Sequence, residues 1–168
     1  MTAYRIAKIE DNWEIGDAFF PTNRDFNRSC FESKKRVEEA LEKARPKGFP
    51  SRRDCVFVCF SEENAEEWAR CLWLQKPISC MSYKILKLEI TDKVYWFQAE
   101  KYNSYHDTWT DEKLEKAAIE YWSSYAEASD DLEVGFEWEG LLDGDARIVD
   151  ITVKNITTID YKALVSNE

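Results

Sequence analysis

The chain has 168 residues, which fits one domain with a substantial hydrophobic core. Its formal net charge of −10 argues against strong non-specific binding to nucleic acid, although a local basic patch could still engage one. Five cysteines without a CxxC pair, together with a single histidine, argue against a zinc site and are typical of a reducing compartment. Met1 to Glu10 carries charges and no apolar run, so we expect no signal peptide, no membrane span and one cytoplasmic domain over residues 1–168.

The first fifty residues predict a strand, a short extended piece and a helix. Residues 4–9 alternate apolar and basic side chains, which predicts a strand, and residues 16–21 predict a short extended piece that ends at a proline. Apolar residues recur at helical spacing over 31–44, and Pro46 ends that helix. The loop 47–53 that follows is basic. We interpret it as a solvated loop, with a local basic patch for an anionic target as the alternative.

Ser61 marks the change from a buried strand to a helix. Residues 55–60 form a continuous apolar run, which predicts a strand covered on both faces, with Cys55 and Cys59 as core residues. Ser61 is a natural N-cap because acidic residues follow it in the first helical turn. Apolar residues at helical spacing extend this helix to Leu72.

The second half predicts mainly strands around one helix. The expected elements are strands at 83–90, 146–153 and 156–161, a short strand or the start of a loop at 94–98, and a helix that begins at Thr110 or Asp111 and includes Leu114 to Tyr125. Residues 99–110 hold four aromatic or histidine side chains among polar ones. We expect this segment to be a loop that covers another part of the molecule.

Two carboxylates, Glu137 and Glu139, stand two residues apart just before the apolar pair Leu141-Leu142. In an extended backbone both side chains leave the same face of the strand. Glutamate is unfavourable in strands, and two close carboxylates repel each other unless a cationic group lies near them. The pattern therefore predicts a place where the protein meets a cationic centre, with solvated surface acids as the alternative.

These residues resemble the mono-ADP-ribosyltransferase superfamily. Glu137-Trp138-Glu139, followed by Gly140-Leu141-Leu142, resembles the ExE motif and the strand after it in the Arg-Ser-Glu branch. Tyr4-Arg5-Ile6-Ala7 stands where that branch has its first-strand arginine, and Phe60-Ser61 stands where a serine closes an apolar strand. The N-terminal layout is also similar to the small rifampicin-inactivating ADP-ribosyltransferases, with an arginine in place of their histidine. The resemblance implies an α+β fold with a split mixed β-sheet core and flanking helices.

The resemblance also implies roles for individual residues. Glu139 would stabilise the positive charge that develops on the NAD ribose, and Glu137 would orient or deprotonate the attacking nucleophile. Arg5 would contact an NAD phosphate or ribose, because a planar and permanently charged guanidinium suits phosphate. The backbone of Ile6-Ala7 would hold the nicotinamide amide, and Ser61 would support Glu139 or the ribose. No metal is expected.

The implied activity is NAD-dependent transfer of ADP-ribose to a macromolecular acceptor, which can be protein, DNA or RNA. A small intracellular transferase would suit the toxin of a toxin–antitoxin or phage-defence system, with an antitoxin or inhibitor protein as its partner; that step rests on family analogy. Two alternatives remain open. One is a non-catalytic binding module with the same fold, and the other is an NAD glycohydrolase without an acceptor.

Overall fold

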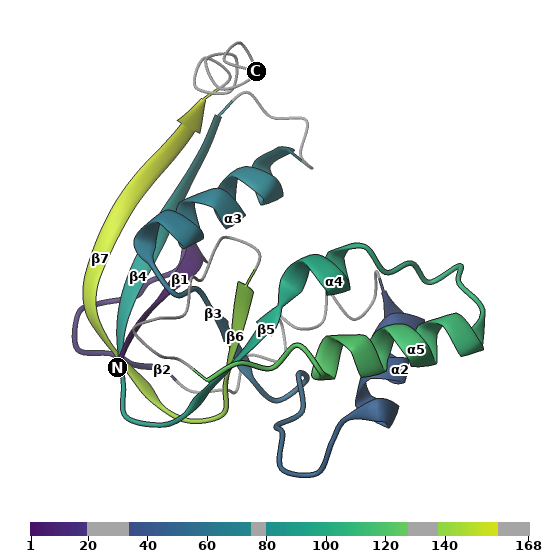
Figure 1. Ribbon diagram of the computed structural model, residues 1–168. Helices are drawn as coiled ribbons and strands as arrows, with labels where there is room; N and C mark the ends of the chain where they lie inside the picture. Colours follow the sequence, from purple (N-terminus) through teal and green to yellow (C-terminus); the bar gives the residue numbers. More distant parts are fainter. Residues whose placement is uncertain (20–33, 75–79, 128–137, 158–168) are drawn as a thin grey trace.

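The structure, a computed structural model, describes residues 1–19, 34–74, 80–127 and 138–157 and has an α+β fold (Figure 1). Its strands are β1 Thr2–Lys8, β2 Ala18–Phe19, β3 Val56–Val58, β4 Cys80–Ile90, β5 Val94–Gln98, β6 Trp138–Leu142 and β7 Ala146–Thr157. Its helices are α2 Lys35–Ala44, α3 Glu62–Leu74, α4 Ala99–Asn103 and α5 Asp111–Trp122. None of these helices is both long enough and apolar enough to cross a membrane.

The described strands form two sheets, which one backbone bridge joins within this part of the chain. The larger sheet has the order β1-β4-β7-β2, and the smaller one has the order β3-β6-β5. Tyr4 of β1 and Cys59, which follows β3, exchange backbone hydrogen bonds of 2.9 and 2.6 Å, and the two strands separate away from this point. Every pairing among the described strands is antiparallel, so the parallel pairs expected of a mixed sheet are not found in this part of the chain.

The smaller sheet separates two apolar cores because its side chains alternate between its faces. On one face Val58 and Trp96 pack toward the larger sheet. On the other face Phe97 and Leu141 pack among residues of α2 and α5, and both are fully buried. A third apolar cluster lies between α3 and the larger sheet, where Figure 1 shows α3 beside β4. Glu139, one residue before Gly140, therefore projects toward the helical layer.

Gly140 sits where the core leaves no room for a side chain. A Cβ atom at this position would lie 2.7 Å from side-chain carbons of Val58 and Val94 and 2.8 Å from the ring of Trp96. Real Cβ atoms do not approach other atoms so closely, because cores are packed to crystal-like density. The glycine therefore allows β6 to lie flat against this core, and it fixes the backbone beside Glu139.

Most predicted elements are confirmed, with two corrections. The strand that begins at Ala146 continues without a break to Thr157, because its pairing with β4 extends to Cys80; residues 156–157 therefore belong to β7, and 158–161 lie outside the described residues. The segment 99–110 is not a simple loop, since it begins with α4 and buries Tyr102 and Tyr105 in the core. Both corrections arise from packing over long sequence separations.

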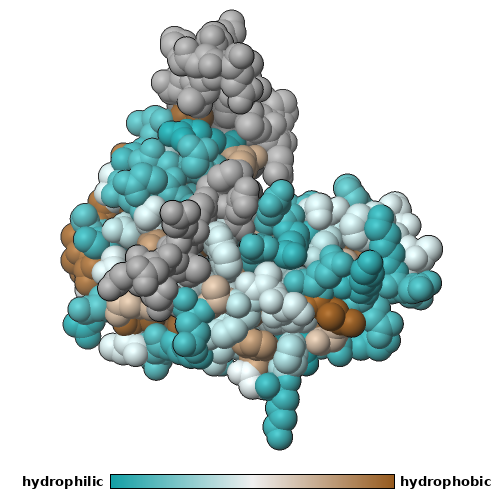
Figure 2. Space-filling model, in the orientation of Figure 1, coloured by the Kyte–Doolittle hydropathy of each residue, from teal (hydrophilic) through white to brown (hydrophobic). Residues whose placement is uncertain are grey.

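The face of the molecule in Figure 2 is mainly polar over the described residues. Figure 2 shows one face of the molecule, on which hydrophilic side chains predominate and apolar ones form small patches. This distribution agrees with the formal net charge of −10. Large exposed apolar patches would indicate an association surface.

We expect the free energy of unfolding to fall at alkaline pH because two cysteine thiols are buried. Burial raises the pKa of Cys55 and of Cys59 to about 12. In the unfolded chain these thiols lose their protons near pH 9, so their stabilising effect is complete below that pH and is lost as the pH rises toward about 12. The expected loss is up to about 1.4 kcal/mol per pH unit for each thiol.

Urea unfolding measured across this pH range checks the expectation. Cys59→Ala should make the loss of stability with pH less steep, whereas Cys71→Ala, at a half-buried position, should change the slope less. Identical slopes for the two variants would contradict the assignment.

Candidate functional site

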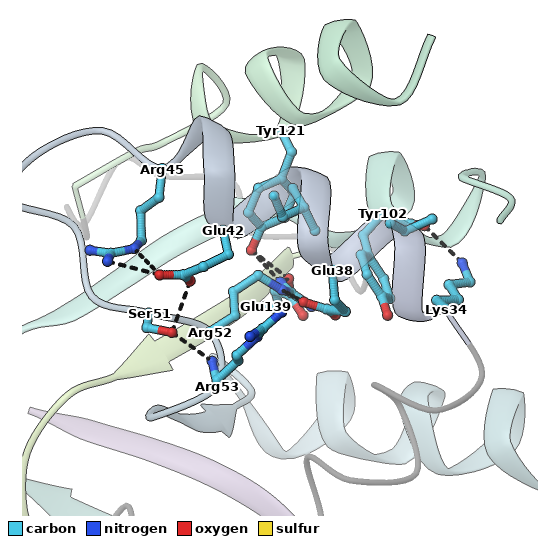
Figure 3. A network of polar contacts seen from close by, with 12 residues as sticks. Lys34, Glu38, Glu42, Arg45, Ser51, Arg52, Arg53, Tyr102, Tyr121 and Glu139 are labelled. Carbon is cyan, nitrogen blue, oxygen red and sulfur yellow. Dashed lines mark hydrogen bonds and ion pairs between the residues drawn. The ribbon is translucent and has the colours of Figure 1, made fainter. Parts of the chain in front are cut away.

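A buried guanidinium, that of Arg52, lies between two carboxylates (Figure 3). Arg52 is 3% exposed. Its Nη1 donates to Oε1 of Glu139 and, at 2.5 Å, to the hydroxyl oxygen of Tyr121. Its Nε lies 3.4 Å from Oε2 of Glu38, so the second ion pair is looser than the first. The three charged groups come from α2, the loop before β3, and β6.

Aromatic rings surround the same guanidinium. The carbon Cζ of Arg52 lies 4.4 Å from the ring centroid of Tyr102 and 4.9 Å from the centroids of Phe57 and Tyr121. A cation over an aromatic face gains about 2 kcal/mol when it is desolvated. These contacts offset part of the cost of removing the guanidinium from water.

Electrostatics keep Arg52 charged despite its burial. Burial alone would lower the pKa of Arg52, but the nearby groups, Glu139 foremost, hold it well above its ordinary value. Burial likewise raises the pKa of Tyr121 well above its ordinary value; Glu139 adds to that rise and Arg52 opposes it. At neutral pH Tyr121 therefore carries its proton and donates it in a hydrogen bond.

The connection between α2 and β3 places Arg52 by folding back on the end of α2. Arg45 Nε donates to Glu42 Oε1 at 3.0 Å, and Ser51 Oγ donates to Glu42 Oε2 at 2.9 Å. Arg45 Nη1 also donates to the carbonyl of Phe49 at 2.7 Å. Gly48 has φ +97°, a conformation that glycine adopts without strain. These contacts hold both ends of the loop next to the buried guanidinium.

Glu139 receives its hydrogen bonds on one oxygen. The Tyr121 hydroxyl donates to Oε1 at 2.6 Å, and Arg52 donates to the same atom. Within the described parts of the chain, no hydrogen bond reaches Oε2. Glu139 is 9% exposed, so the carboxylate is largely withdrawn from solvent. The arrangement leaves one carboxylate oxygen fixed and the other able to meet a ligand.

Arg5 is also buried, at the point where the two sheets separate. Its Nη1 donates to the carbonyl of Phe57 at 2.8 Å, across the gap between β1 and β3. Burial lowers the pKa of Arg5 to about 10, against the opposing effect of Cys59 and Asp11. Burial raises the pKa of Cys59. Arg5 lowers that pKa and Glu139 raises it further, so the Cys59 thiol lies within electrostatic reach of both predicted site residues. Arg5 and Glu139 thus share one electrostatic neighbour, the thiol of Cys59.

The backbones of Ile6 and Ala7 face opposite edges of β1. Tyr4 exchanges its hydrogen bonds with Cys59, so its N–H and C=O point away from β4. Backbone groups of alternate residues point to the same edge of a strand. Ile6 therefore presents its amide and carbonyl to the edge along the split, whereas Ala7 presents them to β4, where it pairs with Lys84. Of the two backbones expected to hold a ligand, only that of Ile6 lies on the open edge.

Ser61 acts as the N-cap of α3. Its Oγ accepts from the N–H of Asn64 at 3.2 Å, and hydrogen bonds from the backbone of Glu63 and from Ser61 lower the pKa of Glu63. The capping role predicted for Ser61 is confirmed. The support of Glu139 expected from Ser61 is supplied in the structure by Arg52 and Tyr121.

Three further expectations meet different outcomes. Glu137 lies outside the described residues, so its position relative to Glu139 stays a prediction. The interpretation of the whole loop 47–53 as solvated is wrong for Arg52, although Lys47 and Arg53 are exposed. Burial of Cys55 and Cys59 in the core is confirmed.

Sequence reasoning did not identify Glu38, Arg52, Tyr102 and Tyr121 as site residues. A weak signal existed for Tyr121, because it lies on the predicted buried face of its helix and a buried tyrosine hydroxyl needs a partner. No local signal separates Arg52 from Arg53, since both precede the same strand.

The described residues contain no group of three or more His, Cys, Asp or Glu side chains able to hold a metal ion. A cavity of about 270 Å³ lies between α2 and α5 and is bordered by Ala40 and Leu114. A smaller one of about 90 Å³ lies beside Tyr83 and Lys154. Neither contacts Glu139 or Arg5.

We expect Arg52→Met to destabilise the fold strongly. Removing the guanidinium leaves two carboxylates, Glu38 and Glu139, buried without their cation, and breaking a buried ion pair in this way costs about 3–5 kcal/mol. The matched control is Arg53→Met at the neighbouring exposed position, where we expect a change within about 0.5 kcal/mol. Chemical unfolding monitored by tryptophan fluorescence measures both. Equal stability of the two variants would show that the buried pair has no structural role.

The comparison with protein families gives one match. The family described as "Protein of unknown function (DUF2441)" matches residues 23–156, a range that includes Glu38, Arg52, Tyr121 and Glu139 and leaves Arg5 outside. The comparison with curated proteins gives no match. Since the matched range covers well over half of the chain, the protein belongs to the DUF2441 family.

Proposed function

We propose that this protein is an NAD-dependent mono-ADP-ribosyltransferase that transfers ADP-ribose from NAD to a macromolecular acceptor. The observation that carries the proposal is the state of Glu139. Its carboxylate is nearly buried, has Oε1 fixed by two donors, and has no hydrogen-bond partner on Oε2 among the described residues. A fixed carboxylate with one available oxygen is suited to stabilise a cation that forms beside it.

The charge balance around Glu139 supports the same chemistry. Among the ion pairs of the described residues, Arg52 contributes one positive charge and its partners Glu38 and Glu139 contribute two negative ones, so these three side chains together carry one negative charge in excess. In a site of low dielectric constant such an excess favours a nearby positive charge. The ribose of NAD acquires positive charge when its bond to nicotinamide breaks, as in glycoside hydrolysis.

The reaction balances with the groups at hand. The bond between the nicotinamide nitrogen and the ribose carbon breaks, and nicotinamide leaves as a neutral molecule with the bonding electron pair. The acceptor's nucleophile forms the new bond to that carbon and loses a proton. We assign Glu139 to the ribose and its 2′-hydroxyl. By the resemblance, Glu137 orients or deprotonates the nucleophile.

The split between the two sheets is where we place the parts of NAD that Glu139 does not contact. Arg5 lies buried at this split and supplies a positive charge that suits a phosphate and N–H donors that suit the hydroxyls of a ribose. The backbone of Ile6 faces the same open edge and offers one donor and one acceptor, which match the nicotinamide amide. The α+β fold with two sheets joined at one bridge is compatible with a split-sheet core.

The acceptor is proposed as protein, DNA or RNA. By family analogy, the transferase acts in the cytoplasm as the toxin of a toxin–antitoxin or phage-defence system and is held inactive by an inhibitor protein. Mass spectrometry of protein and RNA from expressing cells identifies the acceptor directly.

The decisive variant is Glu139→Gln, which preserves the shape of the side chain and removes its charge. We expect consumption of NAD to fall by about 100-fold or more, because the electrostatic stabilisation of the developing cation is lost. Glu89→Gln, which changes an exposed glutamate in β4, serves as the control and should leave the rate unchanged. Incubation of each purified protein with labelled NAD and cell extract measures the rate. If Glu139→Gln retains full activity, Glu139 is not the catalytic residue.

Burial of Glu139 behind Arg52 also favours the second candidate, a non-catalytic binding module. NAD distinguishes the two, because a ligand at about one hundred times its dissociation constant stabilises a protein by about 2.7 kcal/mol. If the protein is the transferase, we expect NAD to raise the temperature of thermal unfolding. We also expect consumption of NAD to require the cell extract. Stabilisation without turnover would indicate a binding module, and release of free ADP-ribose without extract would indicate a glycohydrolase. The absence of both stabilisation and turnover would show that NAD is not the ligand.

A further inference from the structure

We infer that Tyr121 and Arg52 are positioning residues for Glu139: together they hold its Oε1, so that Oε2 is the oxygen that faces the ribose. The inference rests on the proposed function and adds two residues from outside the motifs that suggested it. It also gives to an arginine and a tyrosine the supporting role that the resemblance implied for Ser61.

The three groups form a closed triangle of hydrogen bonds. The Tyr121 hydroxyl donates to Glu139 Oε1 at 2.6 Å, Arg52 Nη1 donates to that same oxygen, and Arg52 Nη1 also donates to the Tyr121 oxygen at 2.5 Å (Figure 3). The terminal torsion of a glutamate side chain is broad, so a carboxylate held by one donor can still rotate. Two donors that converge on one oxygen from different elements remove most of this freedom.

The donors themselves are held by rigid packing. The ring of Tyr121 stacks on Phe97 with 5.0 Å between centroids, and Phe97 is the residue paired with Glu139 across β5 and β6. The neighbouring Trp122 donates from Nε1 to the carbonyl of Leu41 at 2.8 Å, which joins α5 to α2. Arg52 is held from the other side by Glu38. The position of Glu139 Oε1 is therefore set by buried, packed groups: Tyr121 of α5, and Arg52 of the loop before β3.

Such fixation matters for rate more than for binding. A catalytic group misplaced by about 1 Å can cost about 100-fold in rate, whereas ground-state contacts made elsewhere on the ligand are unaffected. A positioning residue should therefore change kcat with little change in KM. A residue with a purely structural role should change neither, provided that the protein remains folded.

The test compares two buried tyrosines, each of which donates one hydrogen bond. Tyr121→Phe removes the hydroxyl beside Glu139, and Tyr105→Phe removes one that donates at 2.7 Å to the carbonyl of Ala117, away from the carboxylates. For NAD consumption we expect Tyr121→Phe to lower kcat by about 10-fold or more with KM within about twofold, and Tyr105→Phe to leave both unchanged. Arg52→Lys keeps the positive charge but loses the planar set of guanidinium N–H donors. We expect this variant to have a lower kcat than the wild-type protein.

A crystal structure of each tyrosine variant adds a readout that does not depend on turnover. We expect the Glu139 carboxylate to rotate or to adopt more than one orientation in Tyr121→Phe and to stay in place in Tyr105→Phe. An unchanged carboxylate in both variants would overturn the inference, as would equal kcat values. A wild-type protein that neither binds nor consumes NAD would instead overturn the proposed function, while the crystallographic comparison would still decide the positioning role.

Discussion

The burial of the Arg52 guanidinium is the interaction on which the rest of the structure depends. A charge in the interior requires partners, because the loss of hydration costs several kcal/mol for each ion. The partners of Arg52 come from α2, β6 and α5, with the ring of Tyr102 from α4 against its face. One side chain thus joins the helical layer to the smaller sheet. The same requirement explains why Glu38 is almost fully buried on an otherwise amphipathic helix.

The proposed function gives this network a chemical role beside its structural one. An ion pair that served stability alone could be replaced by apolar side chains of similar volume, often with no loss. Here the pair leaves one carboxylate oxygen of Glu139, Oε2, without a hydrogen-bond partner among the described residues. Arg5 reaches this split from the larger sheet through the carbonyl of Phe57. Of the two buried arginines, Arg52 contacts Glu139 directly, and Arg5 lies at the bridge between the two sheets.

The limits of sequence reasoning are clearest at Arg52 and Arg53. The two residues share the same neighbours, the same charge and the same predicted loop, yet one is buried and the other is exposed. The partners of Arg52 lie 14, 69 and 87 residues away in the sequence. Local patterns contain no information about such contacts. Ser61, in contrast, could be assigned correctly because its role is local: it caps the helix that directly follows it.

Local patterns were enough to predict the elements whose cause is local: the apolar strand before Ser61, the cap of α3, the N-cap of α5 at Thr110, and the extended segment that holds Glu139. These follow from side-chain periodicity and from hydrogen bonds over three or four residues. Long-range contacts in the folded chain select which arginine enters the core and which oxygen of Glu139 is left without a partner among the described residues. The physical reason is that burial of a charge depends on partners that only the folded chain brings together.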